Sequence, residues 1–248
     1  MENSEFEKRL EDLARRCKKS CDITLTGFLS PAERAAAELW ARRSPDCNML
    51  FHGGDEHCER TVAFFLPYYM EQESFSPEEF IKAIHLTAHF ASPAHRDYMG
   101  ALLGMGIGRE WLGDIRVIEN EAYIFCLPSV HRHLMSIDKV GRVGVKAADM
   151  PLSQIPAPQR QVKNVSFSVM SMRLDAVAAG MFSLSRTECA RHIGAGSVSL
   201  NHLQCLKPDT PVKEGDIISL RGSGKGCVTG TGGTSRKGRQ FVYAEIYK

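Results

Sequence analysis

The sequence lacks any long apolar segment: in 248 residues, no hydrophobic run approaches the roughly 20 residues that span a bilayer. The first residues, Met1 to Arg9, are mostly charged or polar and lack the apolar centre of a secretory signal. Internal repeats with a period of about 20 to 50 residues are absent as well. We therefore expect a cytoplasmic protein that is not associated with a membrane.

Cysteine pairs with metal-ligand spacing are also missing. The chain has 8 cysteines, but none form the Cys-x-x-Cys pairs that usually announce a zinc site. His52, His57 and Cys58 lie close together in the sequence, with Cys47 nearby, yet they do not form a recognisable ligand set. We expect free thiols rather than disulfides, and neither a metal nor a cofactor.

Motifs that carry catalytic chemistry are absent too. The run Gly222–Gly226 superficially resembles a phosphate-binding loop, but it lacks the spacing and the following helix of that motif. His192–Ala195 resembles part of an aminoacyl-tRNA synthetase motif and Arg173–Asp175 a triplet of pseudouridine synthases, yet predicted helices explain both. No nucleophile, base and orienting group can be assembled. The sequence therefore predicts that the protein is not an enzyme.

Charge is distributed unevenly along the chain. The net charge is +2, yet residues 171–248 carry 11 Lys and Arg against 6 Asp and Glu, a balance of +5. Residues 1–170 therefore carry 20 against 23, a balance of −3. A basic module on a slightly acidic body favours a polyanionic partner for the C-terminal third alone.

Residues 1–75 are expected to form a small α/β domain. Residues 2–19 show the alternating charges and apolar spacing of an amphipathic helix. Ser30, followed by a proline, marks the start of a second helix over 31–43. Strand-like segments follow at Met49–Phe51 and Thr61–Leu66.

Residues 76–150 show the order strand, helix, strand, strand, helix, strand. This order is typical of the ferredoxin-like arrangement, which many RNA-recognition domains share. Ser92 and Pro93 are expected to cap the first helix. The expected strands are 80–89, 113–118, 122–127 and 140–147, and the second helix covers 131–136.

Residues 151–170 contain three prolines and are expected to be a linker. The third domain, residues 171–248, is expected to open with two short helices. Ser185 and Glu188 are spaced as a capping box for the second helix, and Gly194 and Gly196 supply its stop. A strand to Asn201 follows, and a glycine-rich loop, Gly222 to Gly233, is expected between strands at 217–221 and 241–247.

This helix pair resembles the small RNA-binding domain named after ribosomal protein S-four. The signature residues are Arg173-Leu-Asp at the first helix, Ser185-Arg at the second, and Gly196-Ser-Val-Ser-Leu-Asn201 at the strand. The alternative is an ordinary helical hairpin with a solvated charged face. The combination of capping chemistry, periodicity and turn residues favours the RNA-binding interpretation.

The chain also resembles the bacterial YlmH family over nearly its whole length. The residues that carry this resemblance are His95–Arg109, Gly113–Ile115 and Val140–Lys146. The resemblance implies an α+β protein with an N-terminal α/β domain, an RNA-recognition-like middle domain and a C-terminal S-four domain. It further implies a non-enzymatic protein that binds rRNA and tRNA and associates with the large ribosomal subunit in quality control of stalled translation. We also expect a monomer.

The resemblance assigns RNA contacts to residues of the third domain. Arginine suits them because its guanidinium binds two phosphate oxygens at once, and a helix N-terminus offers further N–H donors. Asp175 is expected to pair with a basic neighbour, since a carboxylate beside phosphate is unfavourable. Asn201 fits a plain turn role equally well. The assigned residues are Arg173, Ser185, Arg186, Arg191 and Asn201.

Four more cations, Lys225, Arg236, Lys237 and Arg239, surround the glycine-rich loop. They are expected to follow an RNA backbone, with a solvated loop of mixed charge as the alternative.

A second candidate RNA surface lies in the middle domain. Tyr123 and Phe125 share one face of an expected strand, where they resemble the base-stacking aromatics of RNA-recognition domains. Packing in the core is the favoured interpretation of both rings. Arg142 and Lys146, on one face of the last expected strand, either complete this surface or form its solvated side.

Two other classes of function stay open. One is an RNA-modifying enzyme, of the pseudouridine synthase or rRNA methyltransferase type, that its S-four domain delivers to RNA. The other is an adaptor whose N-terminal domain recruits a protein partner. Detection of a modified nucleotide would favour the first, and a stoichiometric protein partner would favour the second.

Overall fold

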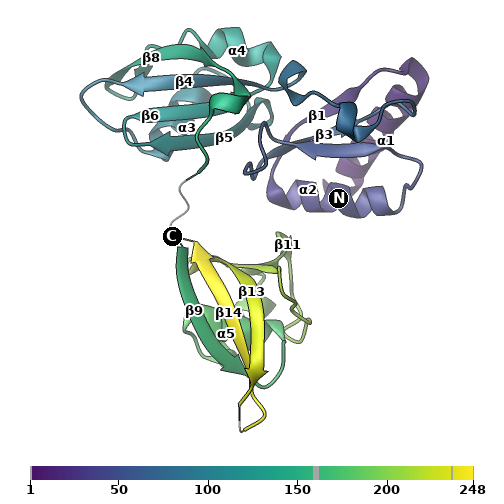
Figure 1. Cartoon of the computed structure of the whole chain (residues 1–248), viewed down its shortest axis with the longest axis vertical. Coiled ribbons are helices and arrows are strands. Elements are labelled where there is room, and N and C mark those ends of the chain that lie inside the picture. Colours follow the sequence, from purple (N-terminus) through teal and green to yellow (C-terminus); the bar gives the residue numbers. More distant parts are fainter. Residues whose placement is uncertain (1, 159–161, 236, 248) are drawn as a thin grey trace. The chain divides into compact units, whose positions relative to one another are not determined.

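The structure, a computed structural model, describes residues 2–158, 162–235 and 237–247. The chain divides after Pro158 into two compact units, residues 1–158 and 159–248, which are described separately (Figure 1). In both units, helices pack on antiparallel sheets, so the protein belongs to the α+β class.

The first unit contains two sheets, and most of its expected elements are confirmed. Ser30 caps α2: its hydroxyl accepts the Glu33 N–H, and the Glu33 carboxylate accepts the Ser30 N–H. The helices are α1 (Glu2–Ser20), α2 (Pro31–Arg42), α3 (His95–Gly104) and α4 (Pro128–Leu134). The strands are β1 (Thr24–Leu29), β2 (Met49–His52), β3 (Thr61–Phe65), β4 (Lys82–Ala88), β5 (Leu112–Ile118), β6 (Glu121–Cys126), β7 (Lys139–Val140) and β8 (Val143–Met150). Short 3-10 turns η1 to η4 cover Gln72–Ser74, Pro77–Glu79, Arg109–Trp111 and Leu152–Gln154.

The first sheet has the strand order β1-β3-β2. Strand β1 was not expected from the sequence. It is an edge strand and pairs with β3, which is the central strand. Helices α1 and α2 cover one face, where Leu10 and Trp40 pack against Phe65. The opposite face carries Phe28 and Phe64, which are directed into a second core.

The middle sheet has the order β5-β6-β4-β8-β7 and confirms the ferredoxin-like arrangement. Its helix-side core contains Ile84, Leu102 and Ile124. Two details differ from expectation. Helix α3 begins after Ala94, whose N–H is accepted by the Asp97 carboxylate, rather than at Ser92 and Pro93. The last expected strand is split into β7 and β8, so that Arg142 lies in the turn between them.

The first two expected domains share a hydrophobic core. Phe28 and Phe64 from the first sheet and Tyr123 and Phe125 from the middle sheet belong to one buried cluster. Gly113 on β5 permits this approach, because a Cβ there would lie 2.7 Å from the Phe28 ring and 2.8 Å from Phe125. The boundary at residue 75 therefore separates two sheets that pack within one compact unit.

Charged groups also join the two sheets. Asp114 on β5 accepts the backbone N–H groups of Glu59 and Arg60, at 2.7 and 3.0 Å. Arg116 on the same strand donates to Asp55 at 2.6 Å. Arg116 and Asp114 thus both bind the segment before β3. Within the sequence motif, Gly113 permits the close approach of the two sheets and Asp114 binds across them, so both residues have a structural role.

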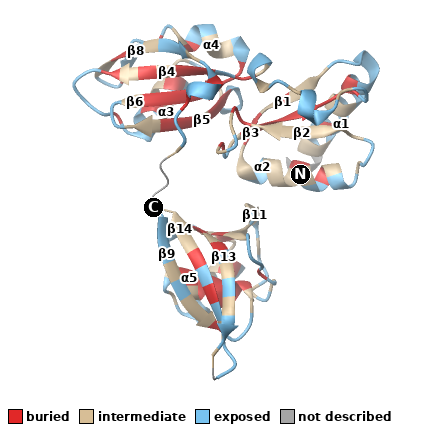
Figure 2. Cartoon of the chain, in the orientation of Figure 1, coloured by how far each residue is buried: buried red, intermediate tan, exposed pale blue. Residues whose placement is uncertain are grey.

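The second unit contains a helix pair packed on a sheet of order β11-β10-β12-β13-β14-β9. Helix α5 is almost wholly buried and red in Figure 2, and Gly196 with φ of 71° follows the second helix. The helices are α5 (Leu174–Phe182) and α6 (Arg186–Gly194); the strands are β9 (Val162–Val169), β10 (Val198–Leu200), β11 (Leu203–Gln204), β12 (Ile217–Leu220), β13 (Gly224–Thr234) and β14 (Gln240–Tyr247).

Two expectations for this unit were wrong. Strand β9 lies within residues 151–170, which were expected to be a linker, and pairs with β14 along its whole length. The expected glycine-rich loop is largely the strand β13, which pairs with β12 and β14. Cross-strand pairing and packing override the low strand preference of glycine. Gly226, for example, leaves no room for a Cβ, which would lie 2.7 Å from the Met181 sulfur.

Candidate nucleic-acid interface

Helix α6 begins with the predicted capping box. The Ser185 hydroxyl accepts the Glu188 N–H at 3.2 Å, and the Glu188 carboxylate accepts the Ser185 N–H at 3.0 Å. The hydrogen bonds that the hydroxyl and the N–H of Ser185 donate to the Glu188 carboxylate keep the pKa of Glu188 below its ordinary value. The Ser185 hydroxyl also donates to this carboxylate at 2.7 Å. Ser185 therefore orients the helix, and its hydroxyl is already engaged.

Asp175, on the first turn of α5, binds two of the three arginines assigned to RNA. Arg186 donates to it at 2.6 Å and Arg173 at 3.2 Å. Burial raises the pKa of this carboxyl, but the hydrogen bonds and charges of Arg186 and Arg173 outweigh burial and hold the pKa below its usual range. The Asp175 side chain is 9% exposed, whereas those of Arg173 and Arg186 are 43% and 57% exposed. The two guanidinium groups are anchored at one edge and keep an open edge for a phosphate.

Arg191 is exposed on the outer side of α6. Its charge lowers the pKa of Glu188, so the two side chains lie near each other. Cys189 and Ile193, on the opposite side of the helix, are completely buried. The expected division between an apolar inner face and a basic outer face is thus present in α6.

Asn201 is a turn residue, which was one of the two interpretations that the sequence left open. It has φ of 49° in the turn between β10 and β11. Its side-chain amide donates to Asp216 at 2.8 Å and accepts the Ile217 N–H at 2.9 Å. Because both ends of the amide are engaged, Asn201 stabilises the sheet.

The cations expected around the glycine-rich loop do not form one group. Lys225 lies at the start of β13, 5.7 Å above the Tyr247 ring. Arg239 lies beyond the other end, where its guanidinium donates to the Ser168 carbonyl at 2.8 Å. The two ends of β13, Gly224 and Thr234, are ten residue steps apart, or about 33 Å along a strand. Lys237 is exposed in the turn near Arg239, and Arg236 lies outside the described residues.

Two exposed aromatic residues on β14 were missed by the sequence reasoning. Phe241 and Tyr243 are 41% and 48% exposed. Tyr243 pairs with Ser166 and Gly230, and a Cβ on Gly232 would lie 2.9 Å from its hydroxyl. Residues two apart on a strand lie on the same face, so the predicted strand already implies that both rings share a face. Only the structure shows that the neighbours of Tyr243 across the strands, Ser166 and Gly230, are too small to cover its ring.

Tyr123 and Phe125 are buried in the core, so they do not belong to a second RNA-binding surface. Tyr123 and Phe125 are 6% and 0% exposed, because the first sheet contributes to the core around them. The Tyr123 ring stacks on His85 at 4.8 Å, and its hydroxyl donates to Glu121 at 2.7 Å. Neither ring is available to stack on a base. Arg142 and Lys146 are exposed, but only Lys146 lies on a strand.

Two members of the His52, His57 and Cys58 group, His52 and Cys58, have separate partners. His52 accepts the Gly54 N–H at 3.0 Å, and the Cys58 thiol lies 3.4 Å from Asp55 and 3.5 Å from Arg116. Burial raises the pKa of Cys58 well above its ordinary value. Among the described residues, no group of three or more His, Cys, Asp or Glu side chains is arranged to hold a metal ion.

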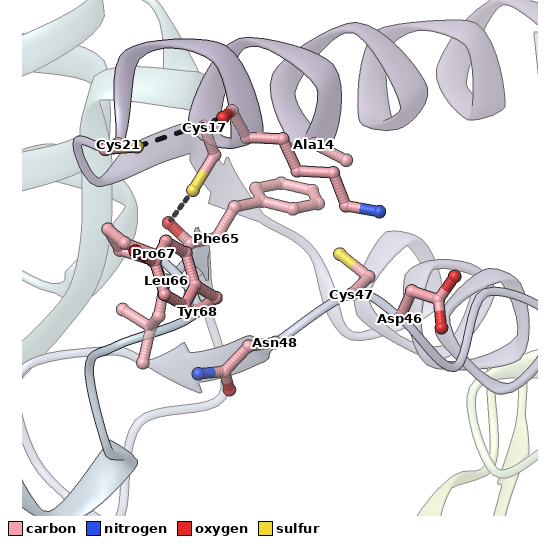
Figure 3. Close-up of a pocket in the computed structure, with 11 residues that line it drawn as sticks. Ala14, Cys17, Cys21, Asp46, Cys47, Asn48, Phe65, Leu66, Pro67 and Tyr68 are labelled. Atoms are coloured by element: carbon pink, nitrogen blue, oxygen red, sulfur yellow. Dashed lines mark hydrogen bonds between the residues drawn. The ribbon is translucent and has the colours of Figure 1, made fainter.

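A small cavity of about 100 Å³ lies between α1 and the segments that flank β2 and β3, with three cysteines in its wall (Figure 3). The Cys17 thiol donates to the Phe65 carbonyl at 3.3 Å. Burial raises the pKa of Cys17 and of Cys47. Protonated thiols are poor nucleophiles, so burial makes Cys17 and Cys47 less reactive. The lining includes Ala14, Cys17, Lys18, Cys21, Cys47, Phe65, Leu66 and Pro67.

The chain is thus a modular α+β protein in which a ferredoxin-like domain precedes a helix pair with an exposed arginine face. No helix in the described part of the chain is long and apolar enough to cross a bilayer.

Comparisons with known proteins agree with this class. Residues 71–154 match the model of the family described as "Putative RNA-binding domain in YlmH". The chain is 29% identical over 227 residues, 91% of its length and 88% of the relative, to the ribosome-associated protein quality control protein P2 of Bacillus subtilis (strain 168). The chain is thus similar to YlmH proteins, in residues 71–154 through the family model and over most of its length through this relative.

A solved structure supports the fold. The cell division protein YlmH from Streptococcus pneumoniae superimposes with a TM-score of 0.55 and covers 63% of this chain and 96% of its own length. The two sequences are 19% identical in this comparison, so the likeness concerns the fold alone.

Proposed function

We propose that this protein binds ribosomal RNA and tRNA without modifying them, and that it acts on the large ribosomal subunit in quality control of stalled translation. The observation that carries the proposal is the outer face of the helix pair, where Asp175 holds Arg173 and Arg186 near the capped N-terminus of α6 and Arg191 is exposed in its last turn. The printed name of the Bacillus subtilis relative, a ribosome-associated quality control protein, supports the same role. A ribosome-bound role places the protein in the cytoplasm, and we propose that it acts there as a monomer.

The arginine face suits phosphate contacts better than base recognition. Each guanidinium offers a planar fork of donors, and such contacts fix position along an RNA backbone without reading sequence. The partner is then chosen by the shape of the RNA together with contacts from other parts of the chain. Lys237 and Arg239, in the turn that follows β13, add exposed positive charge to the second unit.

The test is co-sedimentation of the full chain with purified large ribosomal subunits over a series of salt concentrations. The wild-type protein is expected to sediment at low salt and to be released as salt rises. The double variant R186A/R191A is expected to lower the logarithmic salt slope by roughly 1.5 to 2, because two phosphate contacts are lost. Unchanged binding by this variant would contradict the assigned surface.

A matched control removes two arginine charges from the first unit instead of from the helix pair. Arg15 and Arg16 lie on α1, and the Arg15 side chain is 73% exposed beside Asp12. The R15A/R16A variant is expected to keep the wild-type salt slope. Nucleoside analysis of RNA incubated with the protein tests the non-enzymatic part of the proposal, and a new modified nucleotide would refute it.

A further inference from the structure

Phe90 is a fully exposed aromatic residue on a strained backbone. It follows β4 in the loop that leads to α3, has a relative exposure of 109%, and has φ of 62°. Figure 2 shows this loop in the pale blue of exposed residues. The left-handed region is unfavourable for a bulky side chain, and an exposed phenyl ring gains nothing from burial. Backbone strain of this kind is enriched at active sites and ligand-binding segments.

The loop lies beside the β7–β8 hairpin, which carries exposed cations. The His89 N–H donates to the Gly144 carbonyl at 3.1 Å, and Lys146 pairs with Thr87 across the strands. Continuing this register places Phe90 next to the turn that contains Arg142. Both Arg142 and Lys146 are exposed. The ring thus lies at the tip of the sheet with positive charge on its hairpin side.

Charge on the remaining sides is mixed, and Arg96 lies 3.8 Å from the Asp97 carboxylate. Arg96, in the first turn of α3, has a side chain that is 89% exposed. The Asp97 carboxylate next to it accepts the Ala94 N–H at 2.8 Å. The other nearby carboxylates are Glu119, in the β5–β6 turn, Glu121, which pairs with Thr87 on the side opposite Lys146, and Asp138, before β7. The cations are Arg96, Lys139, Arg142 and Lys146.

We propose that Phe90 stacks on an unpaired base of RNA while Arg142 and Lys146 contact the flanking phosphates. This inference rests on the proposed function and adds a single-strand contact in the middle domain. A protein-docking residue is usually surrounded by further apolar side chains, whereas Phe90 is flanked by His89, Ala91 and exposed cations. Base stacking on an isolated aromatic ring beside positive charge is typical of single-stranded nucleic acid binding.

The test measures binding of the full chain to a fluorescent single-stranded 20-mer of adenosine RNA and to a 20-base-pair RNA duplex. The F90A variant is expected to bind the single strand about 5- to 150-fold more weakly, as expected for the loss of one stacked base. The F90W variant is expected to retain wild-type affinity. Duplex binding is expected to change less than about twofold, because paired bases offer no free face.

Two variants separate stacking from folding. F90G removes both the ring and the backbone strain, so it is expected to melt at or above the wild-type temperature while losing single-strand affinity as F90A does. L103A is the control for loss of an exposed apolar side chain, since Leu103 is 43% exposed on α3. It is expected to bind as the wild-type protein does.

The outcomes distinguish this inference from the proposed function. If the wild-type protein fails to sediment with large subunits, the proposed function is wrong, and the inference that rests on it falls too. If it sediments but F90A binds the single strand normally, or the wild-type protein does not bind it at all, only the stacking role of Phe90 is refuted. If F90A keeps RNA affinity and yet loses subunit binding, a protein replaces RNA as the partner of Phe90.

Discussion

Arg186 donates a 2.6 Å hydrogen bond to Asp175 and thereby joins the first turn of α6 to the first turn of α5. The other oxygen of the same carboxylate accepts from Arg173 at 3.2 Å. One nearly buried carboxylate thus fixes two of the arginines that we assign to RNA. We infer that Asp175 positions the binding surface without contacting RNA.

The variant D175N tests this positioning role. It adds one unit of positive charge, so a purely electrostatic surface would bind RNA more tightly. If orientation matters more, affinity for large subunits falls about 5- to 10-fold, or about 1 to 1.4 kcal/mol, in co-sedimentation. The control D209N makes the same charge change at an exposed carboxylate of the same unit. Equal behaviour of D175N and D209N would contradict the positioning role.

The same carboxylate predicts how stability of the second unit depends on pH. Its pKa is lowered in the folded protein by Arg186 and Arg173 despite burial. A lowered pKa stabilises the folded state at pH values above the ordinary carboxyl pKa of about 3.9, and this contribution is lost as pH falls through the folded pKa. The difference in urea stability between wild type and D175N is therefore expected to be constant near neutral pH and to shrink below about pH 4. A constant difference down to strongly acidic pH would argue against the ion pairs.

Arg116 provides the corresponding prediction for the first unit. Its side chain is 6% exposed, pairs with Asp55, and lies 5.0 Å from the Phe125 ring. The variant R116L leaves Asp55 without its partner, so the free energy of unfolding is expected to fall by about 3 kcal/mol. Urea denaturation of the full chain measures this change. The control R132L alters an exposed arginine on α4 and is expected to cost less than about 0.5 kcal/mol.

Local signals in the sequence predicted much of the fold. The capping boxes at Ser30 and Ser185 and the apolar spacing of α1 and α6 depend on residues a few positions apart, so they can be recognised in the sequence. The order of strands and helices likewise predicted the ferredoxin-like sheet.

The strands that the sequence did not predict are stabilised by pairing with segments that lie elsewhere in the chain. β13 is rich in glycine, and only its pairing with β12 and β14 makes it a strand. Strand β9 follows three prolines that suggested a linker, but pairing with β14 determines its structure. The same holds for the candidate site. Residue types indicated the arginine face, whereas only the structure shows that the Asn201 side chain is hydrogen-bonded and that Phe90 is exposed.

The buried position of Phe125 yields a prediction that separates core packing from RNA recognition. The ring is 0% exposed, and Cβ atoms built on Gly54 and Gly113 would lie 2.3 and 2.8 Å from this residue, so the surrounding backbone is closely packed. F125L is therefore expected to lower the free energy of unfolding by about 1 to 3 kcal/mol because of the cavity left behind. At a temperature well below unfolding, it is expected to bind single-stranded adenosine RNA within about twofold of wild type, whereas F90A does not. The L103A control is expected to change neither property. A variant F125L that keeps full stability but loses RNA affinity would assign base stacking to Phe125 instead of Phe90.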